Sequence, residues 1–381
     1  MDCKFTIFIP TKDRADTLEY TLKTILSQPD EDIQVIVSDN FSGPAVKNLI
    51  DSIKDKRLEY IRTSRSMGMS EHWDFALEHA KGEWVTFVGD DDGLIPGAIS
   101  KLKEIIEENK DIRAITCVNS WYRWPNENDN YGKLSVNGSK GYEVRDCKKF
   151  MHKALLGLPV SQPTIYTGGF VRLDLVNEIK AKSPANKFFN SITADYYSGM
   201  AICSVEDKYI YIWEPFCIAG TSKHSTGFQH KKISSEDRKK MGFYKDCNIK
   251  FNHVLGEAVN ASVGSMQIYL YEAYLQSAHL RNYDLGINLE QQLIISISQS
   301  SKKIRKDLIE YVKTVADANN LDFNKILRSA NLRRPLYKAR KRTLKILRSL
   351  GCGKIPTKMY KSEELKTVYD AAIKIEAVLK S

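Results

Sequence analysis

The stretch FVGDDDGLIPGAI, residues 87–99, places three aspartates side by side at the end of an apolar run. Adjacent carboxylates repel one another, and the cost of that repulsion grows with burial. A chain is expected to keep such a group where something positive compensates the charge. Asp90, Asp91 and Asp92 are therefore predicted to form part of a binding site rather than a solvated turn.

The segments around this stretch alternate between strand and helix patterns. Strands are predicted at 4–10, 33–38, 58–62, 83–88 and 112–118, and helices at 15–28, 44–53, 70–80 and 96–109. This alternation predicts an α/β fold with a mostly parallel, Rossmann-like sheet and helices on both faces. Beyond residue 119 the pattern is irregular, and from about residue 234 onward the chain reads as mostly helical.

The net charge of +10 is concentrated near the C-terminus. Residues 325–361 hold thirteen Lys or Arg and no Asp or Glu, and leucines such as Leu336, Leu344 and Leu347 fall broadly on one helical face. A basic amphipathic helix suits an anionic membrane surface. A solvated helix packed on the rest of the protein, or a contact in a homo-oligomer, remains an alternative. No nucleic-acid motif accompanies the charge, so nucleic acid is not expected as a partner.

Two features bear on the compartment. No apolar run approaches the ~20 residues that span a bilayer, and residues 1–14 lack the layout of a leader peptide. The seven cysteines are widely spread without a CxxC pair, which favours reduced thiols over a disulfide framework or a zinc site. The sequence thus predicts a cytoplasmic protein, at most peripheral on the inner face of the plasma membrane.

Polar side chains follow three of the predicted strands. Ligands of open parallel sheets bind at the carboxyl ends of the strands. The groups expected to converge there are Thr11, Asp13, Arg14, Asp39 and the three aspartates. Such a set of oxygen ligands suits Mg²⁺ or Mn²⁺, which usually bind through one or two carboxylates and substrate phosphates. There is no Walker A sequence and no GxGxxG after the first strand, so the metal is expected to hold most of the phosphate charge.

The segments FIPTKDRADTLEYTLKTILSQ, VIVSDN and GEWVTFVGDDDGL together resemble the family 2 glycosyltransferases of the GT-A fold. The resemblance is good over 4–118 and loose over 119–230. It implies a catalytic domain at 1–230, with a nucleotide-binding half at 1–118 and an acceptor half at 119–230. The region 231–381 lies outside the resemblance and is expected to be an α-helical extension.

The resemblance also implies roles for individual residues. Pro10, Thr11, Asp13 and Asp39 would hold the nucleoside. Asp90, Asp91 and Asp92 match the DXD motif, with Asp90 near the ribose and metal and Asp92 as a metal ligand. The chain has Ser66-Met67-Gly68 where members often carry Asn-x-Gly, so Arg65 or Arg62 is the candidate for the diphosphate. Asp13 as a cap of the following helix, and Asp39 as a turn cap, are alternatives from the residues alone.

The implied reaction is an inverting transfer of a sugar from a nucleotide-diphosphate donor, most often a UDP-sugar, to an acceptor hydroxyl. A carboxylate must take the proton of that hydroxyl. Asp195, in SITADYYSGMAI, is the candidate, with Glu206 and Asp207 as rivals and a plain N-cap as the alternative. The loop GTSKHSTG offers His224 as a metal ligand and Lys223 as a phosphate contact, although His224 also fits an ordinary loop histidine.

The sequence as a whole therefore predicts a metal-dependent transferase that builds a bacterial surface polysaccharide such as O-antigen or capsule. Its acceptor would be a glycan or a lipid-linked glycan. Two other functions stay open: a non-catalytic protein that binds sugar nucleotides or glycans on the same fold, and a sugar-nucleotide pyrophosphorylase. The absence of a glycine-rich loop after the first strand counts against the pyrophosphorylase. The aromatic residues Trp121, Tyr122 and Trp124 fit either core packing or stacking on an acceptor sugar.

Overall fold

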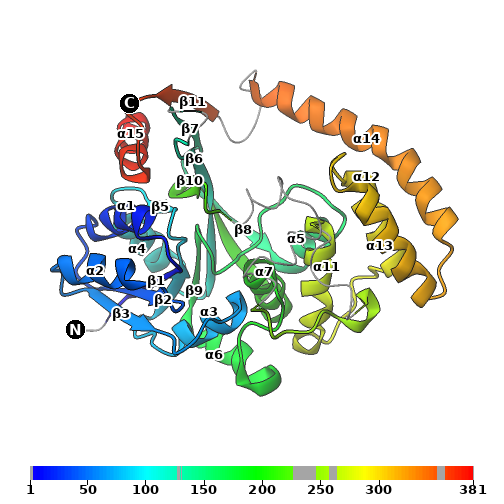
Figure 1. Cartoon of the computed structure of the whole chain (residues 1–381), viewed down its shortest axis with the longest axis horizontal. Helices are drawn as coiled ribbons and strands as arrows, with labels where there is room; N and C mark the ends of the chain where they lie inside the picture. The colour runs from blue at the N-terminus through cyan, green and yellow to red at the C-terminus, as the bar shows by residue number, and fades with distance from the viewer. Residues whose placement is uncertain are drawn as a thin grey trace.

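The structure is a computed structural model that describes residues 3–126, 129, 131–225, 246–256, 264–349 and 357–380. A sheet runs through the molecule, with helices on both faces (Figure 1). Its first part consists of β1 (Phe5–Thr11), β2 (Ile33–Asp39), β3 (Leu58–Arg62) and β4 (Trp84–Phe87). Their pairings, β1 with β2 and β4, and β2 with β3, are parallel. This part of the sheet is as the alternating sequence pattern predicts.

Alternate residues of β1 belong to different faces of the sheet, as the period of a strand requires. Phe5, Ile7 and Ile9 pack in a core with the helices of one face, and Phe8 packs in the core of the other face. The first face is covered by α1 (Ala15–Leu26), α2 (Pro44–Ser52) and α4 (Ala98–Glu108). The second face is covered by α3 (Met69–Leu77), α5 (Cys147–Leu155), α6 (Leu173–Lys182) and α7 (Ala194–Val205).

The rest of the sheet is mixed. It contains β5 (Gly93–Leu94), β6 (Ala114–Arg123), β7 (Gly132–Asn137), β8 (Tyr142–Asp146), β9 (Gly169–Arg172) and β10 (Lys208–Thr221). Long β10 runs parallel to β6 but antiparallel to β5 and β8, and β9 is antiparallel to β4 and β6. The α/β fold class is confirmed, whereas the mostly parallel arrangement holds only for β1 to β4. Antiparallel neighbours need no crossover helix, so they form where the strand–helix alternation stops.

The helices that follow share a core with the second face of the sheet. They include α11 (Met266–Gln276), α12 (Leu289–Gln299), α13 (Arg305–Ala318) and α14 (Phe323–Ser349), with short turns at η1 (Pro184–Asn186), η2 (His253–Leu255) and η3 (Ala278–Leu280). Ile268 of α11 and Leu308 of α13 belong to the same apolar cluster as Trp73 and Phe87. Within the described part of the chain, no helix has the length and apolar character needed to cross a membrane.

The end of the described chain returns to the sheet. β11 (Thr357–Ser362) pairs antiparallel with β7, and Figure 1 shows α15 (Val368–Lys380) beside α1, away from α14. The Tyr122 hydroxyl donates to the carbonyl oxygen of Leu365 at 2.8 Å. The chain after residue 234, predicted to be mostly helical, also contains the strand β11, because β7 offers an unpaired edge on which a further strand satisfies its backbone groups. The boundary predicted at 230/231 lies outside the described residues and stays a prediction.

Candidate functional site

The three aspartates lie in the turn between β4 and β5, at the carboxyl end of a parallel strand. All three are buried, with exposed fractions of 3% for Asp90, 6% for Asp91 and 3% for Asp92. Such burial is costly for carboxylates unless other groups bind them. The partners of each aspartate therefore show what this turn holds together.

Asp90 joins this turn to the loop after β1. Its Oδ2 accepts a hydrogen bond from the Thr11 hydroxyl at 2.8 Å, and its Oδ1 lies 3.1 Å from Nη1 of Arg14. Burial raises the pKa of Asp90, and the nearby Arg14 guanidinium opposes that rise. Three residues predicted to converge at the strand ends are thus in direct contact.

Asp91 joins the turn to the segment that follows β10. Its Oδ2 accepts hydrogen bonds from the backbone N–H and hydroxyl of Ser222, at 3.2 and 2.7 Å, and from the Ser225 hydroxyl. The other oxygen, Oδ1, accepts no hydrogen bond from the described residues. A Cβ on Gly220 would lie 1.8 Å from the carbonyl oxygen of Asp91, so only glycine allows this approach. Asp91 therefore keeps one carboxylate oxygen for a ligand.

Asp92 is the most fully bound of the three. Its Oδ1 accepts from the backbone N–H of Gly220 at 2.6 Å. Its Oδ2 accepts from the N–H of Gly89 at 3.1 Å and from the hydroxyls of Tyr166, at 3.0 Å, and Thr167. Three of these donors share Oδ2, whereas Oδ1 accepts one and keeps a lone pair. Burial, and then repulsion from Asp91, raise the pKa of Asp92 to about 7.

Sequence reasoning missed the partners Tyr166, Thr167, Ser222 and Ser225. The available signals were the glycine pair Gly168-Gly169 and the loop GTSKHSTG, both of which stood out in the sequence. Hydroxyl residues beside such glycines are suited to donate to buried acids, because the backbone there approaches closely.

Asp13 and Asp39 support the same edge of the sheet. Asp13 has a left-handed backbone (φ 55°), and its Oδ1 accepts from the N–H of Gly43 at 2.7 Å. The alternative that Asp13 caps α1 is wrong, because the N-cap position is Arg14, which makes no side-chain cap. Asp39 is fully buried and accepts from the N–H of Ser42 at 2.8 Å and the hydroxyl of Tyr60 at 2.6 Å. Pro10 precedes this edge on β1.

Other predicted residues point elsewhere. The His224 ring lies 3.3 Å from Oδ2 of Asp16 on α1, although the His224 carbonyl accepts from Nη2 of Arg14 at 2.7 Å. Lys223 also approaches Asp16, at 3.6 Å. The structure thus brings the backbone and the serine hydroxyls of this loop to the groups around the aspartates, whereas the His224 ring lies beside Asp16. Arg65 pairs with Glu71 and is largely exposed.

The donor set was tested against a divalent cation. No cluster of three His, Cys, Asp or Glu side chains in metal-binding geometry occurs among the described residues. Nevertheless, three carboxylates are buried side by side, only Asp90 among them forms an ion pair with a described residue, Arg14, and Asp91 Oδ1 accepts no hydrogen bond from the described residues. The chemistry of these residues fits a hard cation such as Mg²⁺ or Mn²⁺.

Asp195 lies in the first turn of α7 and is partly buried. Burial raises the pKa of its carboxyl group, and the backbone N–H of Tyr196 offsets part of that rise. Its rivals differ: Glu206 is held by Arg113 through an ion pair, and the Asp207 side chain is 85% exposed. Among these three acids, Asp195 combines partial burial with the absence of an ion-pair partner in the described chain.

The aromatic residues near the end of β6 divide between the two interpretations. Tyr122 and Trp124 are buried with their ring centroids 5.6 Å apart, and the Trp124 indole donates to the Asp91 carbonyl at 3.0 Å. The core interpretation is therefore right for these two. Trp121 is 56% exposed and remains open to a ligand.

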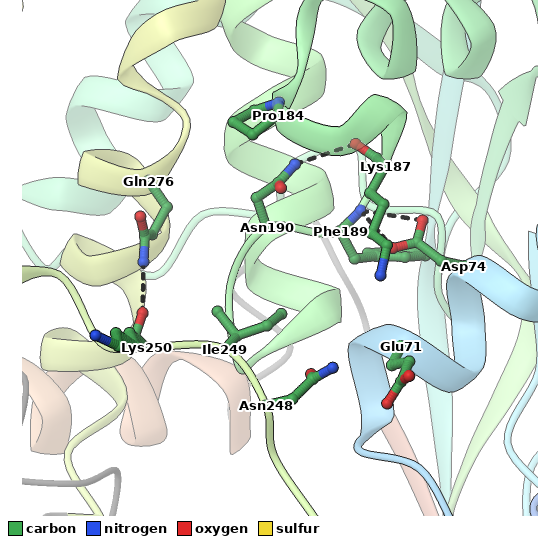
Figure 2. A pocket seen from close by; sticks show the side chains of 10 residues that line it. All are labelled: Glu71, Asp74, Pro184, Lys187, Phe189, Asn190, Asn248, Ile249, Lys250 and Gln276. Carbon is green, nitrogen blue, oxygen red and sulfur yellow. Dashed lines mark hydrogen bonds between the residues drawn. The ribbon is translucent and has the colours of Figure 1, made fainter.

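A separate polar cavity of about 330 Å³ lies between α3 and the segments at 184–190 and 248–250. Figure 2 shows Glu71 and Asp74 on one side of it and Gln276 on the other. The Asp74 carboxylate accepts from the backbone N–H of Phe188 at 2.8 Å, and burial raises the pKa of Asp74 to about 6. None of the residues predicted to bind the nucleotide or metal lines this cavity.

Comparison with known proteins identifies the segment that carries this site. The profile described as "Glycosyl transferase family 2" matches residues 6–155, which include the loops after β1 and β2 and the three aspartates. Residues 6–155 therefore belong to glycosyltransferase family 2. The family expected from the sequence is confirmed over these residues, and the sheet with helices on both faces confirms the α/β fold class.

Two curated relatives match parts of the chain. One is "GalNAc(5)-diNAcBac-PP-undecaprenol beta-1,3-glucosyltransferase" of Campylobacter jejuni, 33% identical over 108 residues, which are 28% of this chain and 35% of that protein. The other is "UDP-Glc:alpha-D-GlcNAc-diphosphoundecaprenol beta-1,3-glucosyltransferase WfaP" of Escherichia coli, 30% identical over 105 residues, which are 28% of this chain and 42% of that protein. The matches thus span less than half the length of these relatives.

Solved structures resemble the chain more distantly. The crystal structure of S. aureus TarS 1-349 superposes with a TM-score of 0.48 at 14% identity, covering 87% of this chain and 91% of that one. A mannosyltransferase from Pyrobaculum calidifontis in complex with GDP-Man and Mn²⁺ gives a TM-score of 0.41. Likenesses at these scores carry no argument about function.

Proposed function

We propose that this protein is an inverting glycosyltransferase that moves a sugar from a nucleotide-diphosphate donor, a UDP-sugar, to a hydroxyl of a glycan or lipid-linked acceptor. One observation carries the proposal. The loops after β1 and β4, which lie within the family 2 match, meet β10 and the segment after it, which lie beyond that match, around three buried aspartates. The two bacterial relatives, which are named for glucosyl transfer to undecaprenol-diphosphate-linked sugars, support a role in bacterial surface polysaccharide synthesis.

The proposal includes Mn²⁺ or Mg²⁺ as cofactor. Such a cation would neutralise the diphosphate of the leaving nucleotide. Asp91 is the first candidate ligand, because its Oδ1 accepts no hydrogen bond from the described residues, whereas each oxygen of Asp90 and Asp92 already accepts at least one. Asp92 stays a predicted ligand through Oδ1, which accepts one hydrogen bond, from the Gly220 N–H. Arg14 would balance part of the carboxylate charge when no donor is present.

Asp195 is the proposed base. A general base must lie within reach of the proton that it takes, and its pKa should not be far below the working pH. Burial moves the pKa of Asp195 in that direction. The proposal also takes 1–230 as the catalytic domain and 231–381 as the C-terminal region, and places the protein in the cytoplasm.

The test is thermal unfolding with UDP, GDP, CMP or dTDP, each with Mn²⁺ or with EDTA. One nucleotide should stabilise the protein in Mn²⁺ only, by about 2.7 kcal/mol at ~100 times its Kd. The matching nucleotide sugar should then be consumed by wild type, and Asp195→Asn should bind it without consuming it. Binding without turnover in wild type would favour a sugar-nucleotide-binding protein, and stabilisation by no nucleotide would contradict the proposal.

A further inference from the structure

A groove of about 1190 Å³ lies between α14 and the segment 156–162 that follows α5. The residues that α14 contributes recur every three or four positions, from Ser329 to Leu344. They form one face of the helix that runs for roughly 22 Å at 1.5 Å per residue. The opposite wall is formed by segment 156–162 and by α11.

The groove presents large apolar side chains to solvent. Leu332 and Leu336 of α14 are 78% and 71% exposed, and Met266 at the start of α11 is 65% exposed. Leu158, Pro159 and Val160 line the other wall. Contiguous apolar side chains left open in this way mark a binding surface.

The charge of the groove has one sign. Arg333, Arg340 and Lys341 line it, and no Asp or Glu does. None of these three cations forms an ion pair with a described residue. Because α14 contains no acidic residue, no carboxylate of its own helix compensates them. An occupant that suits this groove is both apolar and anionic.

One end of the groove lies next to the proposed site. Tyr196, which lines the groove, directly follows Asp195 on α7. Gln162 also lines it, and four residues further along the chain Tyr166 donates to Asp92. Four residues of extended chain span at most about 14 Å, so the Cα atom of the groove residue Gln162 lies within that distance of the Cα atom of Tyr166.

We propose that this groove binds the lipid carrier of the acceptor, a polyprenyl diphosphate, and so presents the acceptor sugar to Asp195. The isoprenoid chain would lie against Leu332 and Leu336, and the diphosphate would meet Arg340 and Lys341. This inference rests on the proposed function and names the substrate class of the same site. Charge complementarity and the position beside Asp195 decide for this occupant over a neutral lipid or an apolar peptide.

The test compares two pairs of substitutions on one helix. Arg340→Gln with Lys341→Gln removes two charges from the groove, and Lys338→Gln with Arg342→Gln removes two exposed charges of α14 that do not line it. The probe is farnesyl diphosphate, with inorganic diphosphate and farnesol as comparison ligands. We expect the groove pair to weaken binding of farnesyl diphosphate at least 10-fold and the control pair less than 2-fold. The melting temperature of each variant checks that it is folded.

A third variant, Leu332→Ser with Leu336→Ser, tests the apolar wall. This variant should bind farnesyl diphosphate at least 5-fold more weakly than wild type and should bind inorganic diphosphate with unchanged affinity. Equal losses in the two charge pairs, or equal affinity for farnesyl and inorganic diphosphate, would overturn the inference. So would binding to phosphatidylglycerol vesicles without binding to farnesyl diphosphate, which would make α14 a membrane-surface helix.

The experiments distinguish failure of the lipid-binding proposal for the groove from failure of the proposed transferase function. A protein that binds a nucleotide in Mn²⁺ but shows no groove-dependent binding of farnesyl diphosphate keeps the transferase proposal and loses the groove. A protein with groove-dependent lipid binding and no nucleotide binding keeps a lipid-diphosphate site and loses the transferase.

Discussion

Asp92 and Glu272 are buried carboxyl groups whose pKa values are both raised to about 7, mainly by burial, in two different regions of the molecule. Asp92, at the strand ends, accepts four hydrogen bonds. Glu272, on α11 in the helical region, accepts one from the Ser191 hydroxyl, and its Oε1 has no hydrogen-bond partner in the described chain.

The two settings indicate different roles. The donors to Asp92 come from three segments, so this acid fixes the positions of the loops around a ligand site. Glu272 holds a single residue, Ser191, in the segment that leads into α7 and Asp195. The hydroxyl of Ser70 donates to the Ser191 carbonyl, so α3 is tied to the same segment. Under the proposed function, the acid at the strand ends would organise the nucleotide side, and the helical acid would support the acceptor side at a cost in stability.

The largest expected effect is the loss of nucleotide binding when Asp91, but not its neighbour Asp92, is neutralised. Asp91→Asn should abolish stabilisation by nucleotide with Mn²⁺ and reduce donor turnover at least 100-fold, since the substitution neutralises the carboxylate whose Oδ1 accepts no hydrogen bond from the described residues. Its melting temperature without ligand should stay near that of wild type. Calorimetric unfolding and a donor-consumption assay measure the two effects.

Asp92→Asn is the matched control. An asparagine amide faces donors where the carboxylate accepted, so unfolding should become easier by about 1–3 kcal/mol. A variant that stays as stable as wild type yet loses Mn²⁺ dependence would make Asp92 the main ligand. Asp92 would then be the aspartate that binds the ligand, and Asp91 the one that holds the loops in place.

The next effect concerns pH and Glu272. Its folded pKa of about 7 lies above the unfolded value near 4.5, so the folded state binds the proton more tightly. The stabilisation from the neutral acid is complete below pH 4.5 and is lost as the pH rises through about 7. Glu272→Gln removes this loss and should raise the free energy of unfolding at pH 8 by up to about 3 kcal/mol.

Denaturant unfolding of both proteins at pH 5 and pH 8 measures this difference. At pH 5 they should be nearly equal. A variant that is less stable than wild type at pH 8 would show that the ionised carboxylate is stabilising, and that Glu272 resembles Asp92 after all. Burial raises the pKa of Asp74 to about 6, so the stability of the variant should still fall with pH, but less steeply than that of wild type.

A smaller effect should follow loss of the hydroxyl that Glu272 accepts from. Ser191→Ala should lower the free energy of unfolding by about 1 kcal/mol at pH 5. At pH 8, where the acceptor Glu272 is ionised, the loss should be about twice as large, because hydrogen bonds to charged groups are stronger. The same unfolding curves measure it. An equal cost at both pH values would mean that Ser191 acts through its contact with the backbone of Thr193 instead.

The sequence was sufficient for part of one of these two regions, the contacts of Asp90, but not for the hydroxyl donors to Asp91 and Asp92. Because a strand has a period of two and its carboxyl end meets its neighbours, the order of strands and polar residues predicted that Thr11, Arg14 and Asp90 would meet, and they do. Glu272 and Ser191 carry no motif, and they meet only because α11 packs against α7. The contact of the His224 ring with Asp16 of α1 could not be predicted for a similar reason, and His224 as a metal ligand stays a prediction.

The smallest expected effect concerns the two arginines proposed for the nucleotide side. Arg65→Ala should change nucleotide affinity less than 2-fold, because Arg65 is 59% exposed and pairs with Glu71, and such surface pairs contribute little. Arg14→Ala should weaken it at least 10-fold, because Arg14 is bound to Asp90 and to the His224 carbonyl. Titration of both variants with the nucleotide found by thermal unfolding measures the ratio. If Arg65→Ala had the larger effect, the phosphates would lie toward α3, and the burial of the three aspartates would no longer mark the centre of the site.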